Sequence, residues 1–163
     1  MALIDEQLVE EWLNRQNFFT MRGIKSGIDE IDLLAVRHNV NGKNDYWHTE
    51  VQVSFRPIGY IGGDTNARKR TEQEIFDGVL QWVDKKFTSE RKVNRRNDIL
   101  PSVSWRYLLV HGEVREITEL GIMKQLGVDL LPYKTVLLEL CADKTKTSSS
   151  TATSITEILN YIR

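Results

Sequence analysis

Two carboxylates and an amide fall at spacings that would bring them together on neighbouring strands. In the segment HTEVQVSF (48–55), Glu50 and Gln52 alternate with valines, so a strand here shows the polar pair on one face. Asp32 lies nine residues before position 41, and Glu50 lies nine residues after it. A hairpin that turns at Asn41–Gly42, a strong hairpin signal, would therefore oppose Asp32 and Glu50 within one residue of register, with Cβ atoms about 4.5–5.5 Å apart.

This pair of carboxylates has the chemistry of a site for a hard metal ion. Two opposed like charges destabilise a sheet unless a cation joins them, and oxygen ligands at this spacing suit Mg²⁺. Asp32 also interrupts IDLLAV (31–36), which otherwise has the composition of a strand buried on both faces, and a buried aspartate needs a partner. The alternative is a solvated strand face, which single Asp and Glu residues on strands usually form. The residues alone leave both interpretations open.

The hydrophobic pattern predicts a single α/β domain over residues 1–163. In chain order, we expect a helix at 4–16, strands at 18–27, 29–38 and 46–55, a helix at 67–87, a basic loop at 88–98, a strand at 102–112, a helix at 115–127 and a buried strand at 133–142. Ser154 and Glu157 predict a capping box for a last helix. A strand meander followed by helix-linked strands implies a sandwich around a mixed sheet.

Composition excludes several classes of protein. The formal net charge is −1, so no strong global field attracts nucleic acid. The single cysteine, Cys141, rules out a disulfide within the chain and predicts a reducing compartment. The N-terminus lacks the basic start and cleavage site of a signal peptide, and no apolar run approaches the roughly 20 residues that span a bilayer. We therefore expect a soluble cytoplasmic protein with no membrane partner.

The motifs GIDEIDLLAV (27–36) and HTEVQVS (48–54), preceded by an acidic amphipathic helix, resemble the PD-(D/E)XK nuclease superfamily. This superfamily includes restriction endonuclease-like and Holliday-junction resolvase-like enzymes, and the resemblance covers roughly residues 4–87. Ile31 stands where the name-giving proline would be, a common replacement. The resemblance implies a restriction endonuclease-like three-layer α/β/α sandwich with a central mixed β-sheet.

The resemblance also implies a ligand set for Mg²⁺, with Mn²⁺ as an alternative. Asp32, Glu50 and the carbonyl of Val51 would hold the metal, and the early glutamate of resolvase-like members matches Glu6, which would reach it through water. Gln52 stands where the family usually has a lysine, whose implied role is to orient the attacking water and offset transition-state charge. Glutamine can hydrogen-bond a water but brings no charge, and some restriction enzymes of this superfamily use a Glu-x-Gln version.

The missing charge predicts a cation from elsewhere in the chain. Lys69, with Arg68 and Arg70, is expected in the first turn of the long helix, where cations oppose the helix dipole and phosphate binds well. Arg56, just beyond Gln52, is another candidate. The alternative for the Arg68–Arg70 segment is a solvated helix end.

A second basic stretch, 85–96, contains a single acidic residue, Glu90. Within it, Lys92, Arg95 and Arg96 are predicted to contact a nucleic-acid backbone, the alternative being a solvated loop. His48 shares the predicted face of Glu50 and is expected to be a flanking polar residue.

Together, these residues and the resemblance predict a metal-dependent nuclease, foremost a DNA endonuclease. Asp32 and Glu50 would bind Mg²⁺, while Gln52 and Lys69 would act on the water and the phosphate. One alternative is a catalytically inactive module of the same fold that binds DNA or assembles with a partner; another is a structural protein in which the acidic pair is chance. A small nuclease domain often acts as a homodimer, so that two sites cut two strands, but the sequence defines no dimer face.

Overall fold

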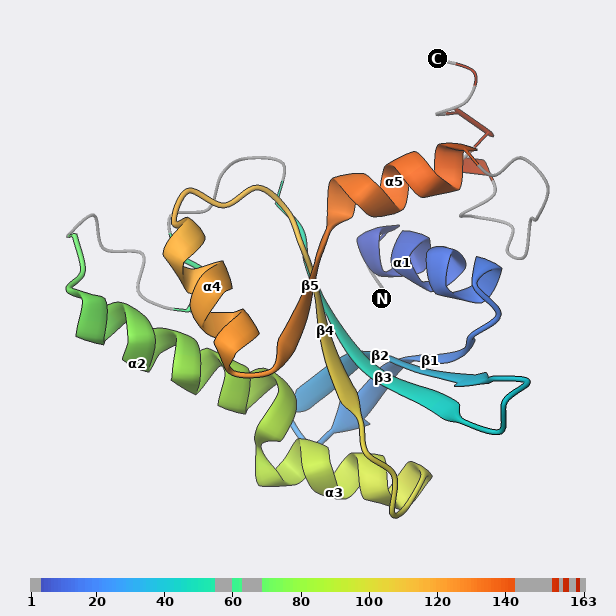
Figure 1. The fold of residues 1–163 in the computed structure, drawn as a ribbon, viewed down its shortest axis with the longest axis horizontal. Helices are drawn as coiled ribbons and strands as arrows, with labels where there is room; N and C mark the ends of the chain where they lie inside the picture. Colours follow the sequence, from blue (N-terminus) through green and yellow to red (C-terminus); the bar gives the residue numbers. More distant parts are fainter. Residues whose placement is uncertain are drawn as a thin grey trace.

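The structure, a computed structural model, describes residues 4–54, 60–62 and 69–142, together with 154, 155, 157, 158 and 161. Figure 1 shows the arrangement of its elements. In chain order they are α1 (Ile4–Arg15), β1 (Phe19–Ser26), β2 (Asp29–His38), β3 (Asn44–Gln52), α2 (Glu72–Val83), the π-helical turn η1 (Asp84–Thr88), α3 (Glu90–Ile99), β4 (Arg106–His111), α4 (Ile117–Gln125), β5 (Val128–Pro132) and α5 (Tyr133–Ala142).

The five strands form one mixed sheet in the order β1-β2-β3-β4-β5. Strands β1, β2 and β3 pair antiparallel, whereas β4 and β5 run parallel to β3. A hairpin is present where predicted, but its turn runs from Asn39 to Gly42 and is not centred on Asn41–Gly42. The N–H of Gly42 donates to the carbonyl of Asn39 at 2.9 Å, and Gly42 has the positive φ (76°) that favours glycine. The local turn therefore fixes the register between β2 and β3.

Helices cover both faces of the sheet, which confirms the predicted three-layer α/β/α sandwich. Helices α1 and α5 lie on one side, and α2, α3 and α4 lie on the other (Figure 1). The apolar stripe of α1 packs with Leu33 and Ala35 of β2 and with Val136 of α5. On the opposite face, Val79 of α2 and Phe87 of η1 belong to a second buried cluster.

The C-terminal part of the domain differs from the prediction, because 133–142 is the helix α5 and not a strand. Its buried residues are Tyr133, Val136 and Leu140, whereas Leu138 is exposed; this is the spacing of one helical face. The last strand is instead β5, just before it. A short apolar run such as TVLLEL does not distinguish a strand from a helix by periodicity.

The basic segment also differs from the prediction, because 90–99 is the helix α3 and not a loop. Its two fully buried side chains are Lys92 and Arg96, so the buried face of α3 is charged and leaves no apolar stripe in the sequence. Helix α2 begins later than predicted, because Thr71 and Glu74 form a capping box that starts it at Glu72.

Several sequence predictions fall at the margins of the described residues. Most of the predicted loop at 56–66 and of the last helix lies outside them. Cys141 is free and partly buried. Among the helices that the structure describes, none combines the length and the apolar character needed to cross a bilayer.

Two helical glycines make a matched test of how α2 packs. A Cβ added to Gly78 of α2 would overlap the carbonyl oxygen of Gly62, whereas a Cβ added to Gly121 of α4 would meet nothing within 4 Å. Alanine gains about 0.5–1 kcal/mol over glycine inside a helix. We expect Gly121→Ala to raise the free energy of unfolding by about that amount, and Gly78→Ala to lower it by about 1–3 kcal/mol through overpacking. Urea unfolding measures both, and stabilisation by Gly78→Ala would show that α2 does not rest on Gly62.

Candidate active site

Asp32 and Glu50 lie near each other at the end of the β2–β3 pairing, where the charge of Glu50 acts on Asp32. The observed pairs are Leu34 with His48 and Leu33 with Thr49, and this register extended by one residue opposes Asp32 and Glu50. The strands are bridged here by a side chain: the N–H of Val51 donates to Oδ2 of Asp32 at 2.8 Å. Asp32 thus fixes the position of β3 at Val51, next to Glu50.

Glu50 is buried, with 1% of its surface exposed, and both of its oxygens have charged or polar partners. Oε1 accepts from Lys92 Nζ at 2.7 Å and His48 Nε2 at 3.0 Å, and Oε2 accepts from Lys86 Nζ at 2.8 Å. Burial alone would raise the pKa of Glu50, but the His48 hydrogen bond and the two lysines outweigh it and lower the pKa to about 2. Glu50 is therefore an anion at neutral pH.

His48, two residues before Glu50 on β3, orients the Glu50 carboxylate by a hydrogen bond. Arg96 Nη1 lies 2.6 Å from His48 Nδ1, and because a guanidinium can only donate, Nδ1 accepts and Nε2 carries the proton that points at Glu50. Burial is the main cause that lowers the pKa of His48 to about 4, so the ring is neutral. His48 also packs against Phe87, with centroids 5.0 Å apart. The expectation of a flanking polar residue is corrected: His48 is fully buried because its hydrogen bonds and ring contacts are made within the core.

The other carboxylates are not neutralised in the same way. The pKa of Asp32 is raised to about 7, first by burial and then by Glu50, against the lowering effects of the Val51 N–H and Lys86. Burial, followed by repulsion from Glu30, also raises the pKa of Glu6, and Glu6 Oε2 is a buried oxygen without a hydrogen-bond partner. Additional positive charge near either carboxylate would therefore be stabilising.

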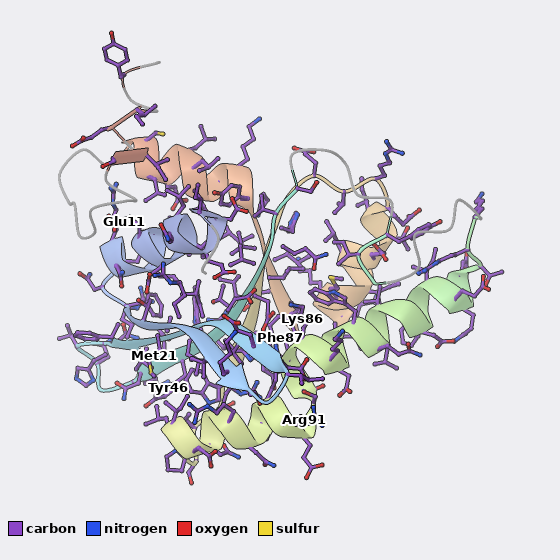
Figure 2. The ribbon with its side chains drawn as sticks, turned by 180° about the vertical axis from the view of Figure 1, so that it is seen from behind. Glu11, Met21, Tyr46, Lys86, Phe87 and Arg91 are labelled. Carbon is purple, nitrogen blue, oxygen red and sulfur yellow. The ribbon has the colours of Figure 1, made fainter. Side chains whose placement is uncertain are left out.

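Lys86 brings a second lysine charge to Glu50. It comes from η1, where the N–H of Ser89 donates to the carbonyl of Asp84 in a π-type bond. Burial lowers the pKa of Lys86, but Glu50 and Asp32 outweigh this and raise it. Figure 2 shows Lys86 and Phe87 side by side where α2 leads into α3. In the sequence, Lys86 is distinguished only as a member of the basic stretch 85–96, which predicts no role for it alone.

The predicted cations occupy other places. Lys69 is exposed and contacts neither Asp32 nor Glu50 within the described ranges, and it precedes the N-cap of α2 instead of lying in its first turn. Arg70 lies over the ring of Tyr60 at 4.7 Å. Arg56 and Arg68 lie outside the described residues. Gln52 is partly buried, and no group in the described part of the chain hydrogen-bonds its side chain.

Two of the residues predicted to touch nucleic acid cannot reach it. Lys92 and Arg96 are 1% and 3% exposed, because they turn inward to Glu50 and His48. Arg95, the third, is partly buried and lines a shallow hollow of about 430 Å³ with Arg91 and Lys25. The part of the basic stretch that faces outward, Arg91 and Arg95, therefore lines this hollow.

Comparison with known proteins leaves the family open. No protein-family model matches the chain, and no curated protein matches it. Among solved structures, the crystal structure of a protein of unknown function, AF1548, superposes with a TM-score of 0.45 at 12% identity, covering 83% of this chain and 64% of that chain. This chain thus spans less than two thirds of that protein's length.

The unbalanced charge on Asp32 predicts an unusual pH dependence of stability. The folded protein keeps the Asp32 proton up to a pKa of about 7, whereas the unfolded chain loses it near the ordinary value of 3.8. The folded state binds more protons between these values, so this carboxyl makes the free energy of unfolding fall as pH rises. We expect Asp32→Asn to stabilise the protein by about 1–3 kcal/mol near pH 8, and by little near pH 4.

The control for this measurement is Asp77→Asn, which removes an exposed acid from α2. Its effect on urea unfolding should stay within about 0.5 kcal/mol at both pH values. A stabilisation by Asp32→Asn that is equal at low and high pH would contradict the raised pKa.

Lys92 and Lys86 are expected to differ in their effect on stability, although both contact Glu50. The Lys92 side chain is 2% exposed and also donates to the carbonyl of Glu30, whereas the Lys86 side chain is 31% exposed. Lys92→Met should lower the free energy of unfolding by about 3–5 kcal/mol, because it breaks a buried ion pair. Lys86→Met should cost less than about 1 kcal/mol. If urea unfolding shows that the two variants lose the same free energy of unfolding, the expected difference between Lys92 and Lys86 is wrong.

Proposed function

We propose that this chain is a metal-dependent nuclease that hydrolyses phosphodiester bonds, with DNA as its substrate. The observation that carries the proposal is the ion pair from Lys86 to Glu50, in which both charges also act on Asp32. It supports the nuclease interpretation because it brings a positive charge to the acidic pair from a helix, in place of the lysine that position 52 lacks.

The donor set fits a hydrated divalent cation. Oδ2 of Asp32 accepts the Val51 N–H, and its other oxygen has no partner among the described residues. Glu6 Oε2 is buried without a hydrogen bond. The raised pKa values of Asp32 and Glu6 indicate that their negative charge lacks compensation. Asp32 and Glu50 would hold the ion, the resemblance adds the Val51 carbonyl, and Glu6 would act through water.

Water and phosphate would have to complete the metal's coordination. Within the described part of the chain, no three His, Cys, Asp or Glu side chains form a ready metal cluster. Magnesium commonly binds through one or two carboxylates and keeps several waters. Such an ion, when bound, would polarise the scissile phosphate and lower the pKa of the attacking water.

The chain's own residues would then position the attacking water and offset the negative charge on the phosphate. Lys86 reaches Glu50 with a partly exposed side chain, so its ammonium can exchange this carboxylate for a phosphate oxygen and offset the charge that develops there. Gln52, on the same strand face as Glu50, would hydrogen-bond the water. Lys92 and His48 keep Glu50 fixed while Lys86 moves.

The hollow beside α3 supports contact with a nucleic-acid backbone. Arg91, Arg95 and Lys25 line it together with the Ser26–Gly27 turn, and Ser26 Oγ donates to the carbonyl of Arg91. The same helix sends Lys92 into the candidate active site. A nucleic-acid strand whose phosphates lie on Arg91 and Arg95 would run along α3, the helix that carries Lys92.

A second candidate function is an inactive module of the same fold that binds DNA. It is favoured by one observation: both oxygens of Glu50 already have partners, two of them lysines. It predicts DNA binding that needs neither metal nor Asp32.

Cleavage of labelled single-stranded, duplex and branched DNA with Mg²⁺ or Mn²⁺ tests the proposal. We expect metal-dependent cutting that Asp32→Asn and Glu50→Gln abolish. Lys86→Met should reduce the rate by about 10²–10³-fold, as for loss of one transition-state contact. Lys85→Met is the matched control, because Lys85 is the exposed neighbour of Lys86, and it should keep the wild-type rate.

Two outcomes would contradict the proposal. Cutting that persists in Asp32→Asn would come from another site or a contaminant. Binding of DNA without cutting, equal in wild type and variants, would favour the inactive module.

A further inference from the structure

A second cavity, of about 270 Å³, opens where three parallel strands end. Its wall includes Val53 beyond β3, His111 and Gly112 at the end of β4, and Pro132 at the end of β5. The first turns of α5 close it with Lys134 and Leu137. The carboxyl ends of parallel strands are where α/β sheets usually bind ligands. We infer that this cavity binds a small organic anion that carries an apolar group.

His111 is a buried polar side chain with one nitrogen left for a ligand. It is 9% exposed, and its Nδ1 lies 2.9 Å from the carbonyl of Gly112. A carbonyl only accepts, so Nδ1 carries a proton and Nε2 is the remaining nitrogen. Nε2 has no hydrogen-bond partner within the described ranges. An anion only accepts hydrogen bonds, so it would bind Nε2 in the doubly protonated imidazolium form of the ring, whose positive charge also favours the anion.

The start of α5 favours negative charge at the same place. The first backbone N–H groups of a helix have no intrahelical acceptor, and the dipole attracts anions there. The first turn of this ten-residue helix has no acidic residue and carries the exposed Lys134. Lys134 and the helix dipole would therefore bind the anionic group, beside His111.

The walls require the ligand to have an apolar part. Val53, Pro132 and Leu137 give the cavity an apolar lining, which a bare inorganic anion would leave wet. The volume lies just below the ~300–1,000 Å³ of pockets for drug-sized ligands, so it suits a smaller molecule. An aromatic or aliphatic phosphate monoester or carboxylate has this combination of size, charge and surface.

Glu113 is expected to weaken binding of an anion in the cavity, an effect opposite to that of Lys134. It is exposed and lines the cavity, so its carboxylate repels a bound anion. Removing that charge should tighten binding, whereas removing Lys134 should weaken it. The inference does not depend on the nuclease proposal, because the cavity includes neither Asp32 nor Glu50.

Titration with phenyl phosphate, followed by ¹H–¹⁵N NMR, tests the inference on the full chain. We expect the amides of Gly112, Glu113 and Lys134 to shift, and Lys134→Ala and His111→Ala each to weaken binding about tenfold. Glu113→Gln should tighten it about threefold. Inorganic phosphate and phenol should each bind at least about tenfold more weakly, because each lacks one half of the ligand.

Lys124→Ala is the charge-matched control, since Lys124 is an exposed lysine on α4 outside the cavity. Equal weakening by Lys124→Ala and Lys134→Ala would overturn the inference as non-specific attraction. Shifts confined to Asp32 and Val51, and lost in Lys86→Met, would overturn it in favour of phosphate at the candidate active site. If His111→Ala does not fold, Lys134→Ala and Glu113→Gln decide, because both side chains are exposed.

Discussion

The buried carboxylate of Glu50 is the constraint on which the middle of this structure depends. An ionised group on a central strand is tolerated only with charged and hydrogen-bonding partners, and here Lys86, Lys92 and His48 provide them. To bring both lysines to one carboxylate, the chain leaves α2 through a π-helical turn and enters α3 with a charged buried face. The path of this connection follows from the charge on β3.

The three acidic side chains of the candidate active site divide into two kinds. Glu50 is fully compensated, and its pKa is low. Asp32 and Glu6 are not compensated, and their pKa values are raised. Folding gains nothing from leaving charge in this state, so the stabilisation expected for Asp32→Asn would mark a residue kept for another purpose. Strain of this kind at a site is common where activity and stability compete.

The candidate active site and the second cavity are neighbours along the same strands. Gln52 pairs with His111 in the parallel register of β3 and β4. Glu50 lies two residues before this pair, and Val53 and Gly112 line the cavity just after it. A ligand in the cavity would therefore contact the continuation of the strand that holds Glu50. The two sites differ in chemistry, because one is acidic with lysines and the other is apolar with His111.

The sequence by itself determined the features that local chemistry controls. The turn that ends at Gly42 and the alternation around Glu50 set the hairpin register, and so the proximity of Asp32 and Glu50, because turn geometry and side-chain alternation act between near neighbours. Only the tertiary structure decided which cation joins that pair, since Lys86 and Lys92 lie 36 and 42 residues from Glu50 in the chain. It also decided that α3 is a helix, because long basic side chains bury their stems and leave no apolar pattern to read.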